Sequence, residues 1–147
     1  MDNELFSRSI GLLGEGNFNR IQDVTIAVFG LGGVGGTALE ALARTGFKHF
    51  IIVDFDKVDA SNINRQILYT ANDVGKNKTD VAKERILAIN PDADIKAFSL
   101  KAQDFDFNQH IDFKSKRLMP VAFLVAPTKS MRKPMPSTPP TRKYSVS

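Results

Sequence analysis

The chain has 147 residues, with 20 Lys and Arg, 16 Asp and Glu and a formal net charge of +4, which suits one modest domain with a single core. Cysteine is absent, so disulfides, thiolate zinc sites and cysteine nucleophiles are excluded. Because no apolar run approaches the ~18 to 20 residues of a membrane helix, and Met1–Ile10 is too polar and acidic for a secretion signal, we expect a cytoplasmic protein that does not associate with membranes.

Two short helices are expected before the first strand. Leu5–Gly14 has the pattern of an amphipathic helix that ends at glycine, and Asn17–Gln22 is compatible with a second helix. The apolar run Thr25–Phe29 then predicts a buried strand. This strand leads directly into a turn rich in glycine.

The turn matches the pattern G-x-G-x-x-G, which is typical of nucleotide-binding loops. Gly30 permits a tight turn, Gly32 lets backbone N–H groups approach a phosphate, and Gly35 lets the next helix pack closely. That helix is expected over Gly33–Thr45, and its N-terminus offers unpaired donors to an anion. A purely structural glycine turn is the alternative, but the strand before the motif and the helix after it favour nucleotide binding.

A second strand is expected over His49–Val53, and Asp54 follows it, nineteen residues after Gly35. An acidic side chain at this place accepts hydrogen bonds from ribose hydroxyls. Strand, helix and strand form one βαβ unit, which predicts a Rossmann-like α/β fold with a parallel sheet.

The polar segment 54–67 comes next. We expect Ser61 to cap a single helical turn that runs through Gln66. Fixed cations hold a triphosphate and neutralise charge as a pyrophosphate leaves, and Arg65 and Lys78 suit that task. Either alone is more simply a solvated surface charge, but their place behind a glycine loop favours the phosphate role. The polar side chains gathered here are Asp54, Asp56, Asn62, Arg65 and Gln66.

A clear helix is predicted over Thr79–Ile89, and a third strand over Asp94–Leu100. Beyond it, four apolar residues lie in a connection whose form the pattern does not define: Phe105, Phe107, Ile111 and Phe113. Three strands amount to half of a doubly wound sheet, whereas a nucleotide normally sits where the strand order reverses. We therefore expect residues 1–113 to be the N-terminal, incomplete half of a nucleotide-binding domain.

The chain changes character near Lys114. Residues 1–113 carry 12 Lys and Arg against 16 Asp and Glu, whereas residues 114–147 carry 8 Lys and Arg, no acidic residue and six of the seven prolines. Apart from Val121–Ala126, which could form one strand, this segment cannot bury enough apolar surface to offset its ordering entropy. We expect a disordered or aberrant tail rather than a basic arm for nucleic acid, and a frameshift before a chance stop would produce such a switch.

Four motifs together make the chain resemble the ThiF/MoeB/HesA family of ubiquitin-activating-like adenylating enzymes. A plain dehydrogenase fingerprint has no reason to carry the last two. They are Gly30-Leu-Gly-Gly-Val-Gly35, Asp54-Phe-Asp56, Asn62-Ile-Asn64-Arg65-Gln66 and Gly75-Lys-Asn-Lys78. Within this family the chain is most similar to the tRNA threonylcarbamoyladenosine dehydratase branch. The segments that carry this similarity are Phe6-Ser-Arg8, Glu40–Gly46 and Arg85–Pro91.

The resemblance implies an ATP-dependent enzyme that adenylates the carboxylate of threonylcarbamoyladenosine in tRNA and so prepares its ring closure. It implies that Asp54 holds the ribose, and that Arg8 enters the site of a partner subunit, hence a homodimer. The phosphate loop would consist of Gly30, Gly32, Gly33 and Gly35. The side chains around the phosphates would be Asn62, Arg65, Gln66 and Lys78, and Asp56 would also belong to the nucleotide-binding residues.

The resemblance also implies Mg²⁺ beside ATP. Relatives bind that ion through an Asp-x-x-Asp segment after a fourth strand, whereas this chain has no acidic residue after Asp112. A histidine site is not expected either, because His49 and His110 lie far apart without a ligand-spaced partner. We therefore assign no metal ligand and expect that the chain lacks a second half and has little activity.

Three alternatives remain open. The substrate could be the C-terminus of a sulfur-carrier protein, as in the ThiF and MoeB branches. An NAD-dependent Rossmann protein is disfavoured, because Arg65, Gln66 and Lys78 would then have no role. A non-catalytic fragment that binds a nucleotide or a partner subunit belongs to a different functional class, and the sequence does not decide between an active and an inactive chain.

Overall fold

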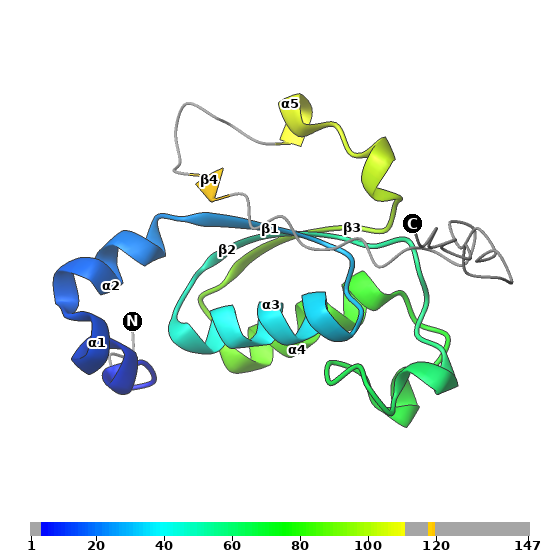
Figure 1. The fold of residues 1–147 in the computed structure, drawn as a ribbon, viewed down its shortest axis with the longest axis horizontal. Coiled ribbons are helices and arrows are strands. Elements are labelled where there is room, and N and C mark those ends of the chain that lie inside the picture. Colours follow the sequence, from blue (N-terminus) through cyan, green and yellow to red (C-terminus); the bar gives the residue numbers. More distant parts are fainter. Residues whose placement is uncertain (1–3, 111–117, 120–147) are drawn as a thin grey trace, which may run out of the picture.

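The computed structural model of the protein describes residues 4–110 and 118–119. Its centre is a parallel sheet with strand order β3-β2-β1-β4 (Figure 1). The strands are β1 (Thr25–Phe29), β2 (His49–Val53), β3 (Asp94–Phe98) and β4 (Leu118–Met119). Parallel neighbours need crossover connections, and helices supply those between the first three strands. The predicted Rossmann-like α/β class is confirmed.

The two crossover helices cover one face of the sheet (Figure 1). α3 (Gly33–Thr45) joins β1 to β2, and α4 (Lys78–Ile89) joins β2 to β3. The remaining helical pieces are α1 (Ser7–Leu13) and α2 (Glu15–Gln22) before β1, the 3₁₀ turns η1 (Ala60–Asn62) and η2 (Ala71–Asp73) before α4, and η3 (Ala102–Asp104) and α5 (Phe107–His110) after β3.

Side chains that alternate along β1 and β2 supply two cores. Toward α3 and α4, the larger core contains Ile26, Val28, Phe50 and Ile52 among other apolar residues. The opposite face has a smaller core of Ala27, Ile51, Val53 and Phe105. Because both faces are covered, the central strands are almost continuously apolar in sequence.

The turn after β2 differs from the prediction. Ser61 does not cap it; Asp59 does. The Asp59 carboxylate accepts the Ser61 N–H at 2.8 Å, and the Asn62 side-chain oxygen accepts the Asp59 N–H at 3.0 Å. This reciprocal pair is a capping box at the start of η1. The Gln66 N–H donates to the Asn62 carbonyl at 2.9 Å, so the hydrogen-bonded turn does reach Gln66, as predicted. The Asp59 carboxylate, two residues before Ser61 in the chain, occupies the N-cap position instead of the Ser61 hydroxyl.

The chain after β3 also holds features that the sequence left undefined. Phe105 is buried against the face of the sheet opposite α3 and α4, with its ring centroid 5.5 Å from that of Phe29 and 5.2 Å from that of Phe98. β4 pairs with β1 and was not predicted; it falls inside the segment 114–147 that was expected to form a tail. The possible strand Val121–Ala126 lies outside the described residues.

The other boundaries follow the sequence closely. α4 begins one residue before the predicted start, at Lys78, and β3 ends two residues before the predicted end, at Phe98. Within the described ranges, none of the helices has both the length and the apolar character needed to cross a membrane.

Candidate nucleotide-binding site

The glycine loop lies at the carboxyl end of β1, where it turns into α3 (Figure 1). Gly30 has a φ of +89°, a conformation that side chains disfavour. A Cβ on Gly35 would lie 1.9 Å from the Gly30 carbonyl oxygen, so this contact requires glycine. The predicted tight turn and the predicted close approach of helix and strand are both confirmed at these two positions.

Asp54 ties the glycine loop to the end of β2. Its carboxylate accepts the Leu31 N–H at 2.6 Å and the Asp56 N–H at 2.8 Å, and the residue is only 9% exposed. A carboxylate has about four acceptor sites, so two backbone donors leave capacity for a ribose hydroxyl. Asp54 thus lies where the sequence predicted a ribose ligand, and it also holds the loop.

Tyr69 is a residue of this site that the sequence analysis missed. Its hydroxyl donates to the Leu31 carbonyl at 2.7 Å from a buried position. Burial, reinforced by the charges of Asp54 and Asp56, raises the pKa of the phenol far above its ordinary value, so the donor stays protonated. The signal available in the sequence was a tyrosine at the end of the apolar run Ile67–Tyr69, since a buried phenol requires a partner.

Gln66 lies against the glycine loop. It is 6% exposed, and its Oε1 is a buried acceptor without a hydrogen-bond partner in the part of the chain that the structure describes. Its Nε2 would be 3.7 Å from a Cβ on Gly32 and is the nearest atom to that position, so the loop is open there. We call the space at Gly32 and the adjoining Gln66 side chain the cradle. It suits a polar ligand with hydroxyl donors, such as a nucleotide.

Lys78 completes the cluster from the start of α4. The residue is 5% exposed, its N–H donates to the Asp56 carbonyl at 3.1 Å, and its Nζ lies 3.5 Å from Asp56 Oδ2. That ion pair is longer than an ordinary charge-assisted hydrogen bond. The ammonium group therefore retains capacity for a further anion, which fits the predicted phosphate role.

The side chains of three other predicted site residues make different contacts or lie elsewhere, although the Arg65 carbonyl is 3.3 Å from the position of a Cβ on Gly33. Arg65 is exposed, and its guanidinium folds back onto the Ser61 carbonyl and the Asn64 side chain. Asn62 is buried, with its side-chain oxygen engaged in the capping box of η1. Arg8 belongs to α1, beyond the amino ends of the strands and at the opposite end of the sheet from the glycine loop (Figure 1).

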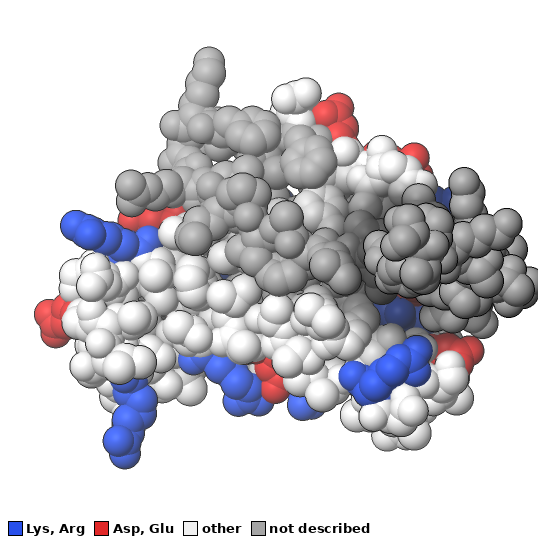
Figure 2. Space-filling view, in the orientation of Figure 1, with Lys and Arg blue, Asp and Glu red and all other residues white. Residues whose placement is uncertain are grey.

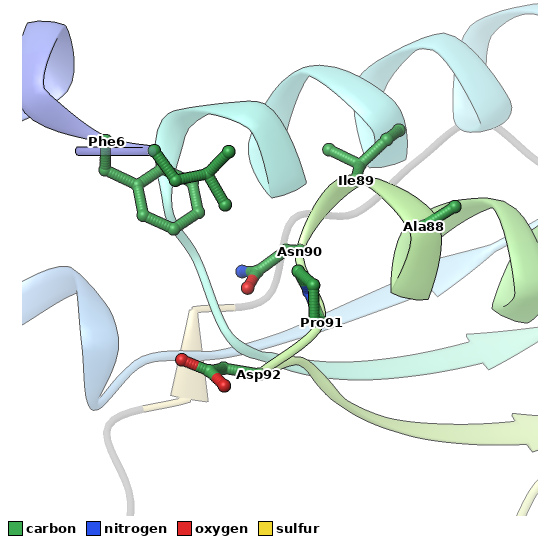
Figure 3. Close-up of a pocket in the computed structure, with 7 residues that line it drawn as sticks. Phe6, Ala88, Ile89, Asn90, Pro91 and Asp92 are labelled. Atoms are coloured by element: carbon green, nitrogen blue, oxygen red, sulfur yellow. The ribbon is translucent and has the colours of Figure 1, made fainter. Parts of the chain in front are cut away.

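A pocket of about 680 Å³ lies elsewhere, between the start of α1 and the end of α4 (Figure 3). Its lining residues are Leu5, Phe6, Ala88, Ile89, Asn90, Pro91 and Asp92. It is at the amino side of β3 and includes none of the predicted site residues. In residues 4–110 and 118–119, no group of three or more His, Asp or Glu side chains is placed to hold a metal ion.

Comparisons with known proteins agree with this geometry. The sequence model of the ThiF family matches residues 6–119. The chain is 38% identical over 108 residues to the tRNA threonylcarbamoyladenosine dehydratase of Bacillus subtilis, covering 74% of this chain and 42% of that protein. It is 42% identical over 87 residues to a probable molybdopterin-synthase adenylyltransferase of Porphyra purpurea, covering 59% of this chain and 23% of that protein.

A solved structure agrees as well. The E. coli tRNA N6-threonylcarbamoyladenosine dehydratase in complex with ATP matches with a TM-score of 0.66 and 38% identity, covering 67% of this chain and 41% of that one. The chain thus spans less than half the length of these relatives.

Proposed function

The chain belongs to the ThiF family, and we propose that it binds ATP and activates a carboxylate by adenylation. The observation that carries the proposal is the cradle at the glycine loop, where the space at Gly32 adjoins the Gln66 side chain, whose Oε1 has no hydrogen-bond partner among the described residues. Asp54, which accepts the Leu31 N–H, would supply an acceptor for ribose, and Lys78, which is paired with Asp56, would supply a cation for phosphate.

In this reaction a carboxylate oxygen attacks the α-phosphorus of ATP, and the bond to pyrophosphate breaks. The N–H groups at the start of α3 face the phosphates, because the first turn of a helix leaves its donors unpaired. Lys78 neutralises the charge that develops as pyrophosphate leaves. Arg65 joins it after leaving the Ser61 carbonyl, Asn62 supports the phosphate side of the site, and Asp56 holds Lys78.

The substrate proposed first is threonylcarbamoyladenosine in tRNA, since the relatives from B. subtilis and E. coli carry that name. The similarity to a molybdopterin-synthase adenylyltransferase keeps a sulfur-carrier protein as the alternative. On the face shown in Figure 2, Lys and Arg are spread along the edges with acidic side chains between them, so a tRNA would need basic groups from elsewhere.

A homodimer belongs to the same proposal. Arg8 lies in α1, far from the glycine loop of its own chain (Figure 1), so it would reach a site only in a second subunit. Mg²⁺ would accompany ATP by family expectation. We assign no step to the ion, because the described part of the chain offers no converging set of ligands.

Calorimetric titration of the 147-residue chain with ATP and with NAD tests the nucleotide. We expect ATP to bind more tightly, since a triphosphate engages Lys78 and the start of α3 together. Tighter binding of NAD would refute adenylation. Binding of neither would leave a fragment that does not recognise nucleotides.

ATP–pyrophosphate exchange then tests the substrate. Exchange that depends on tRNA bearing threonylcarbamoyladenosine would support the first proposal, with unmodified tRNA as the control. Exchange that depends instead on a sulfur-carrier protein with a C-terminal glycine would assign the chain to the alternative.

A further inference from the structure

We propose that Tyr69 is a positioning residue: its hydroxyl sets the orientation of the peptide between Leu31 and Gly32 so that the Gly32 N–H faces the nucleotide. The inference rests on the proposed function, because it assigns a role within the same site. It concerns a residue that touches the loop backbone rather than the ligand.

The Tyr69 hydroxyl acts on a single peptide unit. The Leu31 carbonyl and the Gly32 N–H belong to the same planar group, and in a trans peptide they point in opposite directions. The Tyr69 hydroxyl holds the carbonyl oxygen at 2.7 Å. Holding the oxygen toward the buried phenol therefore directs the Gly32 N–H away from it.

The peptide between Leu31 and Gly32 needs a restraint. The peptide turns about ψ of Leu31 and φ of Gly32, and glycine tolerates φ values that other residues avoid, so a flip of this peptide has a low cost on the Gly32 side. Asp54 holds the Leu31 N–H at 2.6 Å, and the Leu31 side chain is fully buried in the larger core. Those contacts hold the N–H and the side chain of Leu31, whereas the Tyr69 hydroxyl holds its carbonyl.

Tyr69 also links the two halves of the site. The Tyr69 N–H donates to the Gln66 carbonyl at 3.2 Å, so one residue contacts both the glycine loop and the segment that carries Arg65 and Gln66. The hydroxyl and Leu31 are 38 positions apart in the chain. A shift of either segment would therefore move the other.

Tyr69→Phe removes only the hydroxyl and tests the inference. Asn90→Leu is the matched control, since Asn90 is 1% exposed and donates to the Phe47 carbonyl at 3.0 Å, near the start of β3 and away from the loop. Both variants lose one buried hydrogen bond to a backbone carbonyl, so both lose stability. Circular dichroism verifies that each variant is folded.

Two readouts distinguish positioning from stability. In Tyr69→Phe we expect hydrogen exchange of the Leu31 amide, which is bonded to the Asp54 carboxylate, to accelerate about tenfold more than in Asn90→Leu, without ligand. We also expect the Kd for ATP to rise about tenfold, or about 1.4 kcal/mol, while Asn90→Leu binds ATP like the unsubstituted chain.

The outcomes separate the inference from the proposed function. Unchanged exchange at Leu31 would overturn the inference, and so would faster exchange with unchanged ATP affinity. If the unsubstituted chain does not bind ATP, the proposed function fails. Faster exchange in Tyr69→Phe would then still support the restraint on the peptide, because that readout needs no nucleotide.

Discussion

At the scale of single residues, Lys78 is a buried cation with one long ion pair. The residue is 5% exposed, and its only ion-pair partner among the described residues, Asp56 at 3.5 Å, has a side chain that is 49% exposed. Burying an ammonium group costs free energy that a long ion pair offsets only partly. Such an arrangement is typical of a functional site, where stability is lost in return for a positioned charge.

Lys78→Met separates these two effects. The variant keeps the volume and removes the charge, so we expect the free energy of unfolding to stay the same or rise. ATP binding should weaken at least tenfold, because hydrogen bonds to charged groups contribute about 1.5–3 kcal/mol. Urea unfolding and calorimetric titration provide the measurements. Unchanged affinity for ATP would remove Lys78 from the phosphate site.

Asp73, which lies outside the site, makes the free energy of unfolding depend on pH. Hydrogen bonds from Thr70 and Lys76 lower the pKa of its carboxyl from 3.8 to about 2. A depressed pKa in the folded state stabilises the protein while the carboxyl is ionised. The contribution is therefore complete above pH 3.8 and disappears as the pH falls through about 2.

Asp73→Asn should accordingly be less stable than the unsubstituted chain at neutral pH, with a difference that shrinks in acid. Urea unfolding at a series of pH values measures this difference. A difference that stays constant from neutral pH down to about 2 would show that the ionised carboxylate of Asp73 is not what stabilises the turn at η2.

At the scale of elements, the packing of α3 on β1 determines the shape of the site. The helix approaches so closely that Gly35 contacts the Gly30 backbone, which places the start of α3 at the end of the sheet. Gly11 in α1 is the opposite case, because a Cβ there would meet no atom within 4 Å. Two glycines in helices thus have different physical reasons for their presence.

Gly35→Ala and Gly11→Ala form a matched pair. We expect Gly35→Ala to cost about 3 kcal/mol or to prevent folding, since its Cβ meets rigid backbone. Gly11→Ala should gain about 0.5–1 kcal/mol, because alanine favours the helix. Chemical denaturation of both variants measures the two effects. Equal stability of the two variants would contradict the close approach of α3 to β1.

At the scale of the whole molecule, the described residues cover the two faces of the sheet unequally. α3 and α4 cover one face over the larger core, whereas among the described residues Phe105 is the buried residue that reaches the smaller core from beyond the strands. A large share of the stability of that second face therefore depends on one side chain.

Phe105→Ala should cost about 3–5 kcal/mol, the range for a buried phenylalanine, and should expose the apolar face formed by Ile51 and Val53. Phe55→Ala is the control, because Phe55 is 45% exposed. The Lys101 Nζ lies 5.7 Å from the centroid of the Phe55 ring, a cation–π contact worth about 0.5–1 kcal/mol. Thermal unfolding and binding of a hydrophobic dye test both variants. A small effect of Phe105→Ala would mean that other segments cover this face.

Much of the fold could be predicted because its signals are local. The bounds of β1, α3 and β2 follow from an apolar run, a glycine turn and helical spacing, all of which lie within a few residues of the element they define. The acidic residue after β2 was predicted for the same reason. Sequence alone therefore determined the βαβ unit, the parallel α/β class and the position of the glycine loop.

Only the tertiary structure decided the contacts between segments distant in the chain. The pairing of β4 with β1, the burial of Phe105 and the bond from Tyr69 to Leu31 join such segments, and no local pattern encodes them. The capping of η1 by Asp59 was missed because two adjacent capping signals compete, and three-dimensional geometry selects one. The sequence thus specified which groups are present at the site, and the packing of the chain determined which of them meet.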